Sequence, residues 1–267
     1  MRIAVPVKYV PDINAERKFV DCRVDRDPGV GTLNELDENA LEAALRLVES
    51  LDEAEQASSE IVAVTVAPPE GDMALRKAFQ MGVDRGVRVS DDALAGSDYF
   101  GTATALSAAV RRLETEGPVD LVITGMAALD GLGSVVPALL AAELDRPAVT
   151  FAKQIALLDG SVEVTRETDE AAESLLAPLP AVLSVADTAN RPRFPNFKLI
   201  MAARSKEIEA WTAADLGLDP GQVGTAGART ETTHAAPRPE KPAVELVQDK
   251  GEGGKALAEY LIRHELV

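Results

Sequence analysis

The chain is poor in cysteine, histidine and aromatic side chains, and each shortage excludes a class of function. A single cysteine, Cys22, rules out an internal disulfide framework or a cysteine-based metal site, and we expect it to be a bystander thiol. The two histidines, His234 and His264, lie in the C-terminal segment, so histidine-based general-base or metal chemistry is not expected. Aromatic residues make up only 4% of the chain, too few for a platform that stacks nucleic-acid bases.

Positive charge is scarce as well. The chain has 27 Lys and Arg against 44 Asp and Glu, a formal net charge of −17, which argues against non-specific binding to nucleic acid or anionic lipid. No apolar run approaches the length that spans a bilayer, and residues 1–7 already predict a strand. We therefore expect a soluble cytoplasmic protein with no nucleic-acid partner and no direct membrane insertion.

Apolar, β-rich runs alternate with helical patterns from residue 2 to residue 144. This alternation predicts βαβ units and a parallel sheet covered by helices on both faces. Ligands of such sheets bind at the carboxyl ends of the strands, where the strand order switches. The expected strands are 2–8, 61–66, 83–89 and 120–124, and the expected helices are 34–51, 73–81, 97–116 and 138–144.

A glycine-rich stretch, residues 121–137, has the pattern of a buried strand, a turn and a helix start. With Ser134 as the N-cap, Val135 and Val136 would be the first two helical residues and Pro137 the third. Backbone N–H groups and the positive end of the helix dipole would then favour an anion. The alternative is that Asp130–Gly133 is only a tight βα turn.

Three other segments are expected at the same edge of the sheet: Pro6–Lys8, an N-cap at Asn34, and Thr65–Ala67. The acidic residues that follow Asn34 fall in a first helical turn, where the dipole explains them as a solvated face. Together these strand ends form a site for a nucleotide or a similar anion. Nothing in them performs group transfer, so we expect no catalytic residue and no metal ligand.

The C-terminal part has a different pattern. Short β-rich runs after Pro147 predict hairpins or a small mixed edge, and 191–200 is an exposed, proline-rich segment with two phenylalanines. Residues 217–242 read as a linker or an extended arm. The last helix, 255–266, either packs on a partner or folds back on its own chain. We therefore divide the chain into a nucleotide-binding α/β domain, 1–216, and an arm with a C-terminal helix, 217–267.

Six segments occur in an order that is specific when they are taken together: Val5–Lys8 with Pro11 and Asp12, Asn34–Ala44, Ala63–Pro68, Leu75–Gly86, Gly125–Pro137 and Pro192–Glu209. In these the sequence resembles the β subunit of electron transfer flavoproteins, the family that includes the FixA proteins. The resemblance implies a parallel-sheet, adenine nucleotide α-hydrolase-like (Rossmann-type) α/β domain with a small mixed β edge and an extended C-terminal arm.

The resemblance also implies a function. Such a chain forms a heterodimer with an α subunit that holds the redox FAD, and it binds AMP, or a second FAD in electron-bifurcating members. The complex is an electron carrier rather than an enzyme: it passes electrons from acyl-CoA and related flavin dehydrogenases, in fatty acid oxidation, to a quinone oxidoreductase. The alternative is a free-standing nucleotide-binding signalling protein of the universal-stress type, and the presence of the arm favours the first function.

Matched residue by residue, the resemblance implies cofactor contacts at Pro6, Asn34, Val66, Asp130, Gly133, Ser134, Val135 and Val136. It implies that Glu167 pairs with an arginine of the α subunit, and that a recognition loop for the dehydrogenase contains Phe194, Phe197, Leu199 and Ile200.

The chain departs from the family in three places, one of which is the segment after Met201, where Ala202–Glu207 is much less positive than the usual basic run. Ser134, Val135 and Val136 stand where an Asn-Gln-Thr is common, so a phosphate would depend more on the main chain. Phe197 stands where many members have leucine. The alternative for Phe194 and Phe197 is that they pack against their own sheet.

Overall fold

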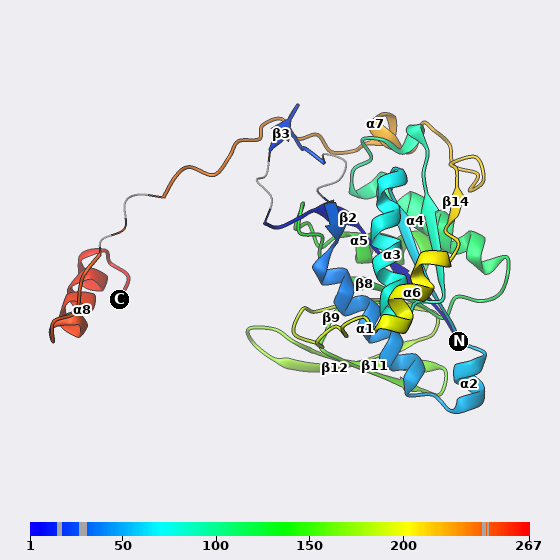
Figure 1. The fold of residues 1–267 in the computed structure, drawn as a ribbon, viewed down its shortest axis with the longest axis horizontal. Helices are drawn as coiled ribbons and strands as arrows, with labels where there is room; N and C mark the ends of the chain where they lie inside the picture. The colour runs from blue at the N-terminus through cyan, green and yellow to red at the C-terminus, as the bar shows by residue number, and fades with distance from the viewer. Residues whose placement is uncertain (15–17, 27–30, 242–243, 245) are drawn as a thin grey trace.

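A seven-stranded parallel sheet with the order β14-β7-β6-β1-β8-β13-β9 forms the centre of the molecule (Figure 1). The computed structural model describes residues 1–14, 18–26, 31–241, 244 and 246–267. The strands are β1 (Arg2–Pro6), β6 (Glu60–Val66), β7 (Arg85–Val89), β8 (Leu121–Gly125), β9 (Ala148–Ala152), β13 (Ala181–Val185) and β14 (Glu209–Trp211). Strands β8 and β13 are buried along their whole length, which explains why they read as continuous apolar runs.

Helices cover both faces of this sheet. On one face lie α1 (Glu35–Glu49) and α3 (Asp72–Met81), and α6 (Phe197–Ser205) packs on α3. On the other lie α4 (Tyr99–Glu114) and α5 (Val136–Leu144). Alternate residues of β1 serve the two cores, since Ile3 and Val5 join the first and Ala4 the second. The remaining short helices of the body are α2 (Glu53–Ala57), η1 (Pro69–Gly71) and η2 (Asp92–Leu94).

The helix boundaries follow the expected signals. Asp98 caps α4 by accepting hydrogen bonds from the N–H groups of Phe100 (3.0 Å) and Gly101 (3.1 Å). Gly82 ends α3 with a φ of 118°, in the region that favours glycine. Both boundaries predicted from the sequence are confirmed.

Small antiparallel sheets complete the body. Strands β10 (Gln154–Leu158), β11 (Ser161–Glu167) and β12 (Ala172–Pro178) form one, and Val162, Val164 and Ala177 join it to the core beneath α1. Two further pairs join β2 (Tyr9–Pro11) to β5 (Gly31–Leu33) and β3 (Phe19–Val20) to β4 (Arg23–Val24). The predicted Rossmann-type α/β class, with a small separate β edge, is confirmed.

The sequence pattern also favours a helix from Met201 to Glu209. Helix α6 instead begins at Phe197 and ends at Ser205, and Glu209–Trp211 adds β14 to the sheet edge, because Trp211 is buried in the core there. The short helix α7 (Gly224–Gly227) follows the buried Val223, so this part of the chain still packs on the body. Beyond it the chain runs outward to α8 (Gly253–Arg263), which stands apart from the body and buries none of its residues (Figure 1).

Candidate functional site

The order of the strands places a switch point between β1 and β8. From β1 the chain goes on to α1 on one face of the sheet, and from β8 it goes on to α5 on the other. The two connections therefore diverge above the ends at Pro6 and Gly125, with the end of β6 at Val66 beside them. This divergence is where parallel α/β sheets bind ligands.

Asp37 lies buried directly at this switch point. Its carboxylate accepts a hydrogen bond from the backbone N–H of Lys8 at 2.8 Å and a second from the backbone of Gly125, so it ties the ends of β1 and β8 together. A Cβ on Gly125 would lie 2.5 Å from Asp37 Oδ1, so the close approach requires glycine. Burial raises the pKa of Asp37 to about 7 against the opposing effect of these hydrogen bonds. The expected solvated face is therefore wrong for Asp37.

Asn34 lies in the same place. The sequence predicted that it caps α1, but its side chain makes no capping hydrogen bond. Its amide instead donates to the carbonyl of Ala127 at 2.8 Å, and its side-chain oxygen accepts from the N–H of Leu129 at 3.0 Å. Asn34 thus fixes the first part of the loop after β8. The physical reason is that, at the switch point, the loop after β8 competes with the N-terminus of α1 for the side-chain amide of Asn34, and the loop binds it.

Asp130 holds two cations at the mouth of the switch point. Lys8 Nζ lies 2.8 Å from Asp130 Oδ1, and Arg26 donates to Oδ2, with Nε at 3.1 Å. The carboxylate is only 2% exposed, whereas Lys8 and Arg26 are 43% and 45% exposed. Burial opposes ionisation of Asp130, but the charges and hydrogen bonds of Lys8 and Arg26 prevail and lower its pKa. The buried carboxylate of Asp130 thus fixes both cations, which remain partly exposed to solvent.

The loop from Gly131 to α5 has an unusual backbone. Leu132 and Ser134 have φ values of 48° and 52°, in the left-handed region. Ser134 is therefore not the N-cap: Val135 takes that place, α5 starts at Val136, and Pro137 is its second residue. The ring of Tyr99 covers Gly133, and a Cβ there would meet it at 2.6 Å.

The marked hollows of the surface lie elsewhere. One of about 280 Å³ is lined by α3 residues with Thr32 and Leu33, and one of about 400 Å³ lies near Met1 and Gly160. The topology of the sheet and the charges at the ends of β1 and β8 mark the switch point instead. Among the described residues, the buried hydroxyl of Thr65, next to Val66, has no hydrogen-bond partner.

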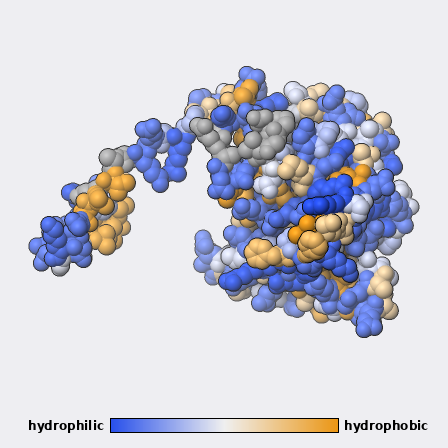
Figure 2. All heavy atoms as spheres, in the orientation of Figure 1, coloured by the Kyte–Doolittle hydropathy of each residue, from blue (hydrophilic) through white to orange (hydrophobic). Residues whose placement is uncertain are grey.

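The residues expected to contact partners lie away from the switch point. Glu167 ends β11 and pairs with Lys153 at 2.5 Å. Phe194 is 97% and Phe197 78% exposed, so they do not pack against their own sheet, whereas Leu199 and Ile200 are half-buried. Figure 2 shows apolar surface over α6 and along one side of α8. The expected recognition loop is partly helical, since Phe197 is the first residue of α6.

Sequence reasoning missed Asp37 and Arg26 as residues of the site. It placed Lys8 at the strand end Pro6–Lys8 but did not identify it as a cation of the site. Asp37 could not be distinguished from the other acids of its turn, and Arg26 lies in a segment without a pattern.

In the part of the chain that the structure describes, no group of His, Cys, Asp and Glu is arranged to hold a metal ion. No described helix is long and apolar enough to cross a membrane.

The fold and the switch point define an α/β protein with a Rossmann-like parallel sheet. The family model of the electron transfer flavoprotein domain matches residues 22–216. The chain is 38% identical to the electron transfer flavoprotein subunit beta of Mycobacterium tuberculosis over 99% of both chains. It is 31% identical to the protein FixA of Azotobacter vinelandii, over 97% of this chain and 92% of that one. It is 32% identical to the caffeyl-CoA reductase-Etf complex subunit CarD of Acetobacterium woodii over 92% of each.

The chain belongs to the electron transfer flavoprotein family, among its β subunits and FixA proteins. Its role is therefore that of an electron transfer flavoprotein, and its relatives are subunits of electron carriers.

Proposed function

We propose that the chain is the β subunit of a heterodimeric electron transfer flavoprotein and that it binds AMP at the switch point. The observation that carries the proposal is the pair of half-exposed cations, Lys8 and Arg26, fixed on Asp130 beside the loop that leads into α5. Main-chain N–H groups at a helix N-terminus and two cations suit a phosphate group.

The residues around this point fit a nucleotide. Asn34 and Asp130 hold the loop and the cations, and Gly133–Val136 would supply main-chain donors to the phosphate. Pro6 and Val66 would flank the nucleotide at the neighbouring strand ends. A second FAD in place of AMP is the alternative at the same site. The redox FAD would be held mostly by the α subunit and would carry the electrons, while this chain binds and orients.

The remaining parts would serve partners. The arm that the sequence predicts at 217–267 begins only after Gly227, because the residues before it pack on the body, and the apolar stripe of α8, with the exposed Leu257 and Ile262, would dock on the α subunit. Glu167 would exchange its pairing with Lys153 for an arginine of that subunit. In this role the complex would act in the cytoplasm and carry electrons from acyl-CoA and related dehydrogenases, in fatty acid oxidation, to a quinone oxidoreductase.

Cofactor analysis of the co-expressed complex tests the proposal. Co-expression with the α subunit should yield a yellow heterodimer that releases one FAD and one AMP after denaturation. Lys8→Gln should lower the AMP content without changing the FAD content, because it removes a cation only from the switch point. Release of two FAD per heterodimer would show that a second flavin, and not AMP, occupies the switch point. A full-length chain that purifies alone as a stable monomer and does not associate with the α subunit would contradict the proposal.

Phe197→Ala tests the docking of the dehydrogenase. An exposed aromatic side chain buried in a partner's pocket contributes roughly 2 kcal/mol, so the KM for the flavoprotein should rise at least tenfold in an assay with an acyl-CoA dehydrogenase. Flavin content and Tm should stay unchanged, because Phe197 is 78% exposed. An unchanged KM would remove Phe197 from the docking surface.

A further inference from the structure

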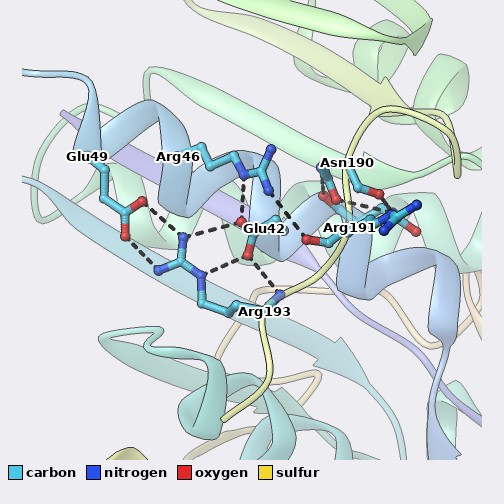
Figure 3. Close-up of polar contacts among 7 residues, drawn as sticks. Glu42, Arg46, Glu49, Asn190, Arg191 and Arg193 are labelled. Carbon is cyan, nitrogen blue, oxygen red and sulfur yellow. Dashed lines mark hydrogen bonds and ion pairs between the residues drawn. The ribbon is translucent and has the colours of Figure 1, made fainter. Parts of the chain in front are cut away.

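A cluster of ion pairs fixes the segment that leads to the exposed phenylalanines (Figure 3). Arg193 Nε lies 2.8 Å from Glu42, and its two terminal nitrogens lie 2.6 and 3.0 Å from the oxygens of Glu49. The backbone N–H of Arg193 also donates to Glu42, at 3.2 Å. Glu42 and Glu49 lie two turns apart on one side of α1, so a single guanidinium bridges both.

The same face of α1 holds the residues before Arg193. Asn39 donates to the carbonyls of Asp187 and Asn190 at 3.2 and 3.1 Å, and Asn190 donates back to the carbonyl of Asn39 at 2.9 Å. Arg46 pairs with Glu42 at 2.6 Å. Side chains of α1 therefore hold the connection from β13 at several points up to Arg193.

The cluster is more polar than stability alone requires. Glu42 is only 3% exposed, and burial opposes its ionisation, but the hydrogen bonds from Arg193 and Arg46 prevail and lower its pKa. Apolar residues of similar volume commonly stabilise such a position as well or better, so a partly buried ion cluster is weak evidence of a stabilising role. Its geometry does something that apolar packing does not, because a bidentate guanidinium fixes both position and direction.

What the cluster directs is the pair of exposed aromatics. Phe194, the next residue, is 97% exposed, and two residues later Asn196 caps α6 by accepting from the N–H of Leu199 at 2.9 Å. Phe197 opens that helix. Phe194 therefore lies between two fixed points, the guanidinium of Arg193 and the cap at Asn196, and Phe197 directly follows the second. Holding them in this way lowers the entropy that docking would otherwise cost.

We propose that Arg193 is a positioning residue that pre-organises Phe194 and Phe197 for docking of the dehydrogenase, by bridging Glu42 and Glu49 of α1. This inference rests on the proposed docking function of the loop. It adds that the affinity depends on a residue that does not itself contact the partner.

The test compares Arg193→Gln with Arg191→Gln in the purified heterodimer. Both substitutions remove one positive charge from the same segment, but of these two arginines only Arg193 forms ion pairs with the described residues of α1. Hydrogen exchange of the peptide 190–200 needs no partner: Arg193→Gln should speed the exchange of its protected amides about tenfold, and Arg191→Gln should not. With an acyl-CoA dehydrogenase, Arg193→Gln should raise the KM for the flavoprotein about tenfold and leave kcat unchanged.

Two further variants separate positioning from folding. Arg193→Lys keeps the positive charge but not the planar guanidinium that bridges Glu42 and Glu49. Its affinity for the dehydrogenase should therefore lie between those of the parent and Arg193→Gln. Glu49→Gln removes half of the bridge from an exposed position, and should raise the KM by a smaller factor. Equal exchange rates and equal KM values in Arg193→Gln and Arg191→Gln would overturn the inference. So would a loss of Tm and flavin that accounts for the loss of activity.

Phe197→Ala distinguishes this failure from a failure of the docking proposal. If Phe197→Ala raises the KM and Arg193→Gln does not, the docking surface stands and the positioning role is wrong. If neither changes the KM, both are wrong.

Discussion

At the scale of single residues, the buried carboxylate of Asp37 has the clearest measurable consequence. Burial raises its pKa from the ordinary value of 3.8 to about 7. Between these values the folded chain keeps a proton that the unfolded chain has lost. The free energy of unfolding therefore falls as pH rises from about 4 to about 7, and Asp37 adds no further pH dependence above that range.

Asp37→Asn should remove this contribution. The difference in unfolding free energy between Asp37→Asn and the parent complex should shift in favour of the variant from pH 5 to pH 7, by up to about 1.4 kcal/mol per pH unit. Thermal or urea unfolding with the same bound nucleotide measures it. Glu35→Gln, an exposed acid of the same turn, serves as the matched control and should run parallel to the parent. Parallel curves for Asp37→Asn as well would show that Asp37 is ionised throughout.

The loop offers a matched pair of glycines. Gly133→Ala should lower the AMP content, because the new methyl group meets the ring of Tyr99 and displaces either the ring or the loop. Gly131→Ala, two residues earlier, has no atom within 4 Å of its new Cβ and should keep the nucleotide. Nucleotide extraction from the two purified complexes gives the comparison. Equal nucleotide contents in the two variants would mean that the ring of Tyr99 moves aside without changing the loop.

How far the sequence specifies the site differs from residue to residue. Glycines and strand ends located the loop after β8, because those signals are local. The roles of Asn34 and Asp37 could not be predicted, because an Asn or Asp at this spacing is equally compatible with a helix cap and with a buried contact to another segment. What distinguishes the two is the approach of Gly125, at the end of β8, and Ala127, in the loop after it, both far along the chain.

At the scale of elements, Asp98 joins helix α4 to the start of the arm. One oxygen caps α4, and the other accepts from the N–H groups of Arg229 and Thr230 at 2.7 and 2.8 Å. The guanidinium of Arg229 also lies 4.8 Å from the ring centre of Phe100. The N-terminus of α4 therefore holds the root of the arm.

Two substitutions of Asp98 should separate these contacts. Asp98→Ala should cost about 1 to 2 kcal/mol of stability, because it removes the cap. Asp98→Asn keeps an oxygen for the cap, so its Tm should stay close to that of the parent, while trypsin should cleave after Arg229 faster. The exposed Lys250, which precedes Gly251, is the internal control for cleavage. Unchanged cleavage after Arg229 would mean that the carboxylate does not hold the arm.

Elements were predictable where the pattern is local and strong. The parallel strands β1, β6, β7 and β8 and helices α1, α3 and α4 follow from apolar runs, spacing and caps. Strands β9 and β13 were expected in hairpins or the small mixed edge but join the parallel sheet instead. The segment after Asn196 was not predictable, because the helix start depends on a cap within a proline-rich stretch, and β14 depends on Trp211 finding the core. Edge strands of three residues carry too little pattern to be read alone.

At the scale of the whole molecule, the body and the arm make separate contributions. The two core clusters are built from residues up to Val223, so removal of residues 228–267 should leave the body folded. Such a truncated chain should co-purify with less α subunit, whereas removal of 253–267 alone tests α8 by itself. Pull-down on a tagged α subunit, with circular dichroism as the folding control, measures both. Full recovery of the complex would assign the association to the body.

The ion pairs of Asp130 have a consequence for how an anion enters. In a molecule of net charge −17, bare cations at a binding site would gather small anions from the buffer. Here Lys8 and Arg26 already have a resident counter-ion, so an incoming phosphate competes with a carboxylate instead of filling a positive vacancy. Binding becomes an ion exchange within the protein. Its affinity should therefore depend less steeply on salt than that of a site of free cations, and chloride or sulfate should be poor competitors.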